Sequence, residues 1–287
     1  MCRFFILFIL IALRVYNAYA AESPLAQALS TKAAEVKKLL ADDLRMIVRE
    51  PFIIAGNLSE KNLATWHQQT IQPAAAALGR QYFTTPPNAP IVIWLFTDAD
   101  TYTRHAERIY GDKDISVYGY YKPDQRALVM NIGTGGGTLI HELAHALAAV
   151  DFPGQPDWFN EGLASLYEQS RFAGTGEKLR IYGLTNWRLP KLQEAIKAGK
   201  LQSLTELMSL RDFRGANMGL NYAQARYFCQ YLQEQGKLEE YYRAFRDNRE
   251  EDPHGLKAAK KVLGAEAWQI IDADYQKWVL GLRPIKN

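Results

Sequence analysis

Apolar residues in the N-terminal half of the chain follow helical spacing in some segments and form short continuous runs in others. Three helices are expected, over residues 24–48, 63–82 and 98–110. Pro73 predicts a break or kink inside the second of them. Continuous apolar runs predict strands over 52–55 and 91–96, and the second run, apolar at every position, is typical of a strand buried on both faces.

A β-hairpin and then a helical region follow. Apolar segments at 117–121 and 126–132 flank Lys122-Pro123-Asp124-Gln125, whose residues favour a turn. After residue 137 the pattern predicts helices and loops alone, and no Gly/Ser/Pro-rich linker separates the two halves. We therefore expect one α+β unit: an N-terminal mixed α/β lobe (22–137) with a small sheet of three or four strands, and a C-terminal helical lobe (138–287).

The first twenty residues have the three-part layout of a secretory signal peptide. Arg3 precedes the apolar run Phe4–Leu13, and Ala18-Tyr19-Ala20 supplies the small residues of a cleavage site. Cleavage after Ala20 would leave residues 21–287 outside the cytoplasm, in a periplasm or secreted. Ten apolar residues are too few to span a bilayer, which needs about 20. Arg14, unusually close to the cleavage site, keeps an uncleaved N-terminal anchor open as an alternative; otherwise we expect no stable membrane insertion.

The composition is that of a globular protein, with 48% hydrophobic and 23% charged residues. Lys and Arg number 34 and Asp and Glu 31, and this net charge of +3 is too balanced to predict binding to nucleic acid. Without the signal peptide, Cys229 is the one cysteine left, so no intramolecular disulfide can form. We expect its thiol to be buried and unreactive.

The informative segment is His141-Glu142-Leu143-Ala144-His145, with Thr138 as the expected N-cap of its helix. Two histidines four residues apart lie on one face of a helix, one turn from each other, and can bind one ion. Imidazole nitrogen is a good ligand for Zn²⁺. Glu142 is rotated away from the ligand direction but can reach a water molecule beside the ion. This pattern predicts metal-assisted hydrolysis with Glu142 as the general base.

Catalytic zinc needs a third protein ligand, and Glu161 is the strongest candidate. It lies in Pro156-Asp157-Trp158-Phe159-Asn160-Glu161-Gly162, where Pro156 and Asp157 predict a helix start and Gly162 a close approach to the first helix. Asp151 is an alternative, because another zinc-protease pattern places a ligand there. That pattern also requires a glycine where this chain has Ala148. His105 is a more remote alternative.

These motifs, from Thr138 to Tyr167, resemble those of the gluzincin zinc metallopeptidases, in particular the peptidase MA-like family. The resemblance implies a zincin-like fold, one Zn²⁺ per chain bound between the lobes by His141, His145 and Glu161, and Glu142 as general base. It also implies a peptide or protein substrate. Two departures stand out: the spacer 146–160 is shorter than in the best-known gluzincins, and Ser165 stands where some relatives carry a carboxylate that orients a ligand histidine.

The same resemblance implies a Tyr or His on a later helix that supports the oxyanion. Tyr222, at the start of a helix after the loop 214–219, is the matching candidate, and a core tyrosine is its alternative. The strand over 128–132 is expected to form the cleft edge that pairs with substrate. Two other functions remain open: a non-catalytic, extracytoplasmic zinc-binding scaffold for a protein partner, and a hydrolase of cell-wall peptide bridges.

Overall fold

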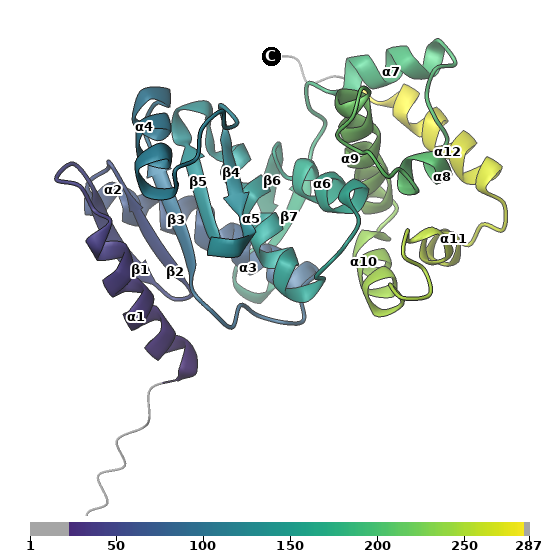
Figure 1. Cartoon of the computed structure of the whole chain (residues 1–287). Coiled ribbons are helices and arrows are strands. Elements are labelled where there is room, and N and C mark those ends of the chain that lie inside the picture. The colour runs from purple at the N-terminus through teal and green to yellow at the C-terminus, as the bar shows by residue number, and fades with distance from the viewer. Residues whose placement is uncertain (1–22, 284–287) are drawn as a thin grey trace, which may run out of the picture.

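A five-stranded mixed sheet forms the centre of the N-terminal region in the computed structural model, which describes residues 23–283 (Figure 1). The strands are β1 (Arg45–Arg49), β2 (Phe52–Gly56), β3 (Ile91–Phe96), β4 (Gly119–Lys122) and β5 (Ala127–Asn131), in the spatial order β1-β2-β3-β5-β4. β2, β3 and β5 run parallel to one another, and the two outer strands are antiparallel to their neighbours. The mixed α/β region with a small sheet is therefore confirmed, with one more strand than expected.

Each central strand sends alternate side chains to the two faces of the sheet, as the two-residue period of a strand requires. In β3, Ile91, Ile93 and Leu95 pack into one hydrophobic cluster, and the intervening residues pack into another. Helices α1 (Pro24–Lys38) and α4 (Ala99–Tyr110) cover one face. Helices α2 (Glu60–Trp66), α3 (Gln72–Gln81) and α5 (Gly136–Asp151) cover the other (Figure 1). The sheet is thus the middle of three layers, and α5 lies directly on it.

The prediction of a single helix over residues 24–48 was wrong at its C-terminal end. Helix α1 ends at Lys38, and Arg45–Arg49 forms strand β1, paired antiparallel with β2. Ile47 and Val48 are β-branched and favour a strand, and pairing with a neighbouring strand outweighs the apolar spacing that suggested a helix.

The expected break at Pro73 takes the form of a π-helical turn. Residues His67–Ile71 form this turn between α2 and α3, which begins at Gln72. Pro73 has no N–H and its ring clashes with the carbonyl of an ideal preceding turn, so a wider turn there removes the conflict. The helical segments α2, the π-helical turn and α3 therefore follow one another without an intervening loop.

The C-terminal region is mostly helical, but it also contains a small hairpin that the sequence pattern did not predict. Its helices are α6 (Asp157–Leu166), α7 (Leu189–Lys197), α8 (Leu204–Met208), α9 (Met218–Glu234), α10 (Leu238–Asp247), α11 (Leu256–Leu263) and α12 (Trp268–Gly281). Strands β6 (Ser170–Ala173) and β7 (Arg180–Gly183) pair antiparallel. Each strand is only four residues long, and β6 has no buried residue, which explains why the hairpin looks like loop in the sequence.

The predicted hairpin is present, but the position of its strands contradicts the expected cleft edge. β5 lies between β3 and β4, so both of its edges are already hydrogen-bonded within the sheet. β4 is the outer strand, and its free edge is the one that could pair with an added strand. The edge role assigned to residues 128–132 therefore passes to Gly119–Lys122.

The predicted signal peptide, residues 1–20, and its alternative as an anchor lie outside the described residues. Between residues 23 and 283, no helix combines the length and the apolar character that a membrane span requires.

Asp151, considered above as a metal ligand, instead joins the two regions of the fold. Its fully buried carboxylate accepts hydrogen bonds from the backbone N–H groups of Thr84 (2.8 Å) and Thr85 (2.7 Å) and from the Tyr242 hydroxyl (3.0 Å). Arg246 adds an ion pair at 2.7 Å. Burial acts to raise the pKa of Asp151, but these partners outweigh it and lower the pKa below the ordinary value of 3.8.

Asp151→Asn should therefore lower the free energy of unfolding by about 2 kcal/mol at pH 7, because the neutral amide loses its charge-assisted hydrogen bond with Arg246, which keeps only its ion pair with Asp247 at 2.9 Å. Since the folded-state pKa is depressed, the carboxylate stabilises fully above its unfolded pKa of about 3.9, and this stabilisation is lost as the pH falls through the folded pKa. Urea unfolding at pH 7 and at pH 3 should show the difference between variant and wild type shrinking at acid pH. Asp274→Asn, at an exposed position, is the control. A difference that stays constant with pH would contradict the assignment.

Candidate metal centre

Helix α5 carries His141, Glu142 and His145 into a cleft between the sheet and the C-terminal helices. The helix begins three residues earlier than predicted: Gly135, at φ 106°, is the N-cap, and Thr138 lies inside the first turn. Gly137 is required where this turn passes another segment, because a Cβ there would lie 2.1 Å from the Glu168 carbonyl oxygen. The close approach brings Glu168 next to the histidine face of α5.

Helix α6 supplies the third candidate ligand. It begins at Asp157 after Pro156, as predicted, and Glu161 lies on its second turn. Gly162 serves a different contact from the one expected: a Cβ there would lie 2.9 Å from the Ala225 carbonyl oxygen and 3.1 Å from Cys229 Sγ. The small residue therefore lets α6 pack against α9 rather than against α5.

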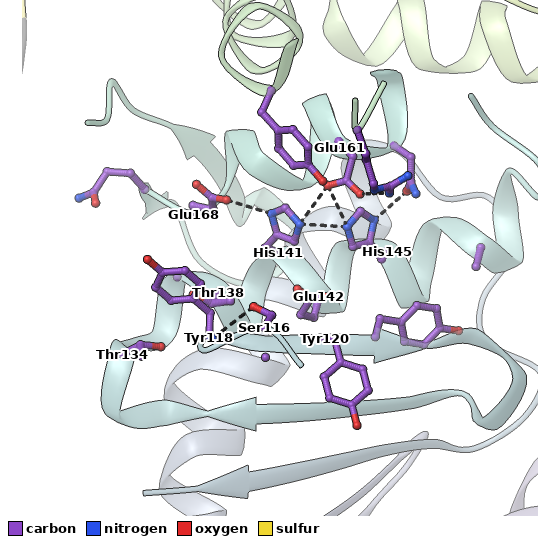
Figure 2. Close-up of a pocket in the computed structure, with 18 of the residues that line it drawn as sticks. Ser116, Tyr118, Tyr120, Thr134, Thr138, His141, Glu142, His145, Glu161 and Glu168 are labelled. Atoms are coloured by element: carbon purple, nitrogen blue, oxygen red, sulfur yellow. Dashed lines mark hydrogen bonds and ion pairs between the residues drawn. The ribbon is translucent and has the colours of Figure 1, made fainter. Parts of the chain in front are cut away.

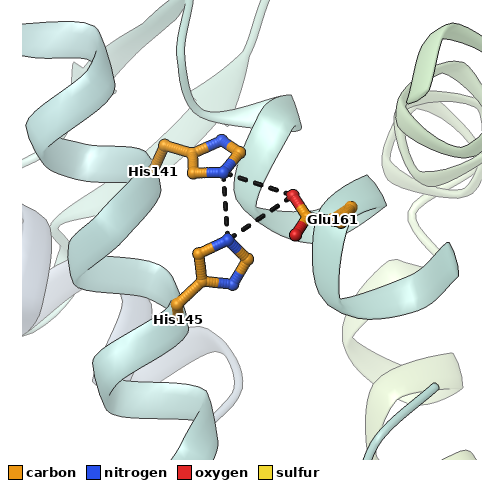
Figure 3. A group of neighbouring side chains, drawn as sticks. All are labelled: His141, His145 and Glu161. Atoms are coloured by element: carbon orange, nitrogen blue, oxygen red, sulfur yellow. Dashed lines mark hydrogen bonds and ion pairs between the residues drawn. The ribbon is translucent and has the colours of Figure 1, made fainter. Parts of the chain in front are cut away.

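The two histidines and Glu161 point at one another, as Figure 3 shows. The Nε2 atoms of His141 and His145 are 3.0 Å apart, and Glu161 Oε2 lies 3.4 Å from the first and 3.5 Å from the second. All three side chains are at least nine-tenths buried. Within residues 23–283, this trio forms the one His/Cys/Asp/Glu group compact enough to hold a metal ion.

The donor set fits a tetrahedral zinc ion. Bonds of 2.0–2.1 Å at tetrahedral angles place neighbouring ligand atoms about 3.3 Å apart. The observed separations of 3.0, 3.4 and 3.5 Å bracket that value. Two nitrogens and one carboxylate oxygen are also a ligand combination found in catalytic zinc sites, which keep a fourth position open. The residues present therefore fit the predicted ion.

Both imidazoles have an oxygen atom near Nδ1 and turn Nε2 toward Glu161. His145 Nδ1 donates to Asn160 Oδ1 at 2.7 Å, and the Gln155 amide donates to the same oxygen at 3.1 Å. His141 Nδ1 lies 3.2 Å from Glu168 Oε1 (Figure 2). Since Asn160 Oδ1 only accepts, Nδ1 of His145 carries a proton, and Glu168 faces Nδ1 of His141 as an ion-pair partner. Such partners fix the orientation of metal-binding histidines and increase their basicity.

The carboxylates around the two imidazoles favour a positive charge close to the three donor atoms. Burial opposes protonation of His141, but hydrogen bonds to Glu161 and Glu168 outweigh it and raise the pKa of His141 to about 10. Burial likewise acts to raise the carboxyl pKa values, but the histidines lower the pKa of Glu161 far below its usual range. His141 and Arg188 together lower the pKa of Glu168 to about 2. The carboxylates are therefore ionised at neutral pH and stabilise a cation beside them.

Tyr222 and Glu142 line the same cleft as the three donors. Tyr222 is on the second turn of α9, half buried. Burial, reinforced by the charge of Glu161, raises the pKa of its phenol above 10, so the phenol keeps its proton at neutral pH and can donate a hydrogen bond. Glu142 is on α5, beside His141 and largely buried (Figure 2). The structure thus brings all five predicted site residues to one cleft.

The cleft has a volume of about 900 Å³ and opens beside the outer strand of the sheet. Tyr118, Gly119, Tyr120 and Tyr121 form its wall on the β4 side. Trp187 lines the cleft as well and is 75% exposed. The β4 residues and the three donor side chains therefore line one continuous cleft.

The other candidates from the sequence lie outside this site. Asp151 is held in the network described above, and its carboxylate is not part of the His141 group. His105 Nε2 contacts Asp43 at 3.1 Å and its ring stacks on Phe96. Cys229 is fully buried, and burial raises the pKa of its thiol well above the usual value, as expected for an unreactive cysteine.

Three residues that contact the predicted ligands were missed by the sequence analysis, namely Asn160, Glu168 and Arg214, and so was Arg188, which contacts Glu168. Glu168 takes over the orienting contact that Ser165 lacks, and Arg188 holds it with two hydrogen bonds. Asn160 directly precedes Glu161 and could have been noticed for that reason. The two arginines lie 20 and 53 residues from the carboxylates they contact, so nothing local in the sequence marks them.

Compared with known proteins, the chain matches no protein-family model and no curated sequence.

Proposed function

We propose that the protein is a zinc-dependent metallopeptidase that hydrolyses peptide bonds outside the cytoplasm. The observation that supports this proposal most strongly is the convergence of two imidazole nitrogens and one carboxylate oxygen within 3.5 Å, in a cleft that Glu142 also lines. An acidic side chain next to two ligands has no evident structural purpose in a largely buried position. A carboxylate beside two metal-binding histidines is the arrangement that metal-assisted hydrolysis requires. The extracytoplasmic location rests on the predicted signal peptide.

The catalytic roles follow from the chemistry of the side chains. A bound zinc ion would acidify water and polarise the scissile carbonyl group. The Glu142 carboxylate takes the proton from the attacking water and passes it to the leaving amine nitrogen. The Tyr222 hydroxyl donates a hydrogen bond to the carbonyl oxygen as negative charge develops there. Glu161, His141 and His145 would hold the ion.

Strand β4 offers the means of aligning a substrate. Its free edge presents unpaired backbone N–H and C=O groups, and its residues line the cleft. An extended peptide could add to this edge as a further strand, with main-chain hydrogen bonds that do not depend on side-chain identity. This mode of binding suits peptide or protein substrates.

A library of internally quenched peptides tests the proposal. We expect the purified residues 21–287 to cleave members of the library when loaded with Zn²⁺. Cleavage should stop in the presence of a chelator and return when Zn²⁺ is added back. The cleavage sites, read by mass spectrometry, would distinguish endopeptidase from exopeptidase action.

The same experiment separates the proposal from its main rival. If the protein binds zinc stoichiometrically and yet cleaves neither the library peptides nor a cell-wall peptide bridge offered alongside them, that result would favour a non-catalytic scaffold. Cleavage that persists unchanged in chelator would contradict metal-assisted hydrolysis altogether.

A further inference from the structure

We propose that Arg214 is a positioning residue for the candidate metal ligand Glu161. It holds one carboxylate oxygen so that the other alone is offered to the ion. This inference rests on the proposed function, because it assigns a role within the same zinc site. Its basis is a set of contacts that the ligand motif does not include.

The two oxygens of Glu161 have different partners. Arg214 Nη2 donates to Glu161 Oε1 at 2.6 Å. The other oxygen, Oε2, faces the two imidazoles at 3.4 and 3.5 Å. A charge-assisted hydrogen bond of this length is strong, so the carboxylate is held with a fixed division of roles between its oxygens.

Arg214 is itself anchored one helical turn away. Its Nη1 donates to Asp157 Oδ2 at 2.7 Å, while Nη2 holds Glu161. Asp157 and Glu161 are four residues apart on α6, so their side chains are neighbours on one face of the helix. The planar guanidinium has donors on separate nitrogens and can bridge both carboxylates at once. The ammonium group of lysine is a single point and cannot reproduce this fork.

The three side chains of this bridge differ in how far they are exposed to solvent. The Glu161 side chain is 6% exposed, whereas those of Arg214 and Asp157 are each 48% exposed. Arg214 therefore reaches from the solvent side, out of the loop between α8 and α9, to a buried carboxylate that lines the cleft. The cost of burying the charge of Glu161 is offset on one side by Arg214 and on the other by the imidazoles.

Glu161 could occupy one or two coordination positions on an ion, depending on how many of its oxygens bind. A carboxylate that used both oxygens would take two positions, whereas a catalytic zinc site keeps three protein ligands and one open position. With Oε1 bound to Arg214, Glu161 offers Oε2 alone. Arg214 thereby keeps open the position that water or substrate must use.

The test compares Arg214→Ala and Arg214→Lys with Arg104→Ala. Arg104 is an exposed arginine on α4 in a weak ion pair with Asp43 at 3.6 Å, and it matches the loss of one charge away from the cleft. The zinc affinity of each purified protein is measured by competition with a chromophoric chelator. We expect Arg214→Ala to bind zinc about 10- to 100-fold more weakly than wild type. The zinc affinity of Arg214→Lys should lie between those of Arg214→Ala and wild type, and the affinity of Arg104→Ala should equal that of wild type.

The direction in which the zinc affinity changes distinguishes the loss of a charge from the loss of orientation. Removal of a nearby positive charge should by itself tighten the binding of a cation, so weaker binding isolates the loss of orientation. Substitution with Co²⁺ gives a second reading, because its visible absorption depends on coordination number. We expect Arg214→Ala to show the weaker absorption of a higher coordination number, and circular dichroism of the metal-free proteins to show that both Arg214 variants are folded.

Zinc binding by Arg214→Ala that is equal to or tighter than that of wild type, with an unchanged cobalt spectrum, would overturn the inference. The proposed function would still stand in that case, provided that the wild type binds zinc and cleaves peptides. If the wild type itself binds no zinc, both the proposed function and the role of Arg214 are overturned.

Discussion

Glu142→Gln should leave zinc binding unchanged and lower the turnover of a cleavable peptide by about 10²- to 10⁴-fold. General acid–base groups typically contribute a factor of this size. Glutamine has nearly the shape of glutamate, so the packing of α5 is preserved, but its amide cannot accept a proton from water at neutral pH. The measurement is kcat/KM for one peptide from the library, together with the zinc content of the purified variant.

Glu266→Gln provides the matched control, because Glu266 is exposed and lies outside the cleft. It loses the same charge and should retain full activity and zinc content. Undiminished hydrolysis by Glu142→Gln would refute the assignment of the general base. Loss of zinc from that variant would instead place Glu142 among the ligands.

Much of the candidate site could be predicted because its signals are local. His141 and His145 are one helical turn apart, so the helix period alone places their rings together. Glu161 follows a recognisable helix start at Pro156, and the structure brings it within 3.5 Å of both rings. The central strands were equally clear, since an unbroken apolar run such as Ile91–Phe96 has few alternatives to a buried strand.

The parts that were missed depend on contacts between distant segments. Strand β1 exists because Arg45–Arg49 can pair with Phe52–Gly56, and this pairing outweighs the local spacing that suggested a helix. The order of strands in the sheet cannot be read from the hairpin alone, and so the outer strand was assigned to 128–132 instead of Gly119–Lys122. Local pattern decides which element forms, whereas tertiary contacts decide which of its edges is free.

The same distinction explains the partners of the ligands. Glu168 lies beside His141 because Gly137 lets the first turn of α5 pass within contact distance of its backbone. Arg188 and Arg214 reach the site from loops, where no periodicity constrains the chain. Sequence reasoning therefore finds the residues that would perform the chemistry more easily than those that hold them in position.

Removal of one imidazole should abolish the stabilisation of the folded protein by zinc. Zinc that binds the folded state alone, at a concentration 100-fold above its Kd, adds about 2.7 kcal/mol to the free energy of unfolding. For a chain of this size, such a gain corresponds to a rise in Tm of roughly 5–10 °C. His145→Ala keeps only His141 and Glu161 as ligands, which is too few for a catalytic or structural zinc site. We expect its Tm to be the same with and without zinc.

The measurement is thermal unfolding of wild type, His145→Ala and His254→Ala, each with a chelator and with an excess of Zn²⁺. His254 lies outside the cleft, and its backbone carbonyl, not its imidazole, accepts a hydrogen bond from Trp158. His254→Ala should therefore keep the full rise in Tm. A rise of equal size in His145→Ala would show that zinc binds elsewhere, and the convergence of His141, His145 and Glu161 would then have no role in metal binding. Because the shift is read without any substrate, this result holds whether or not the protein cleaves peptides.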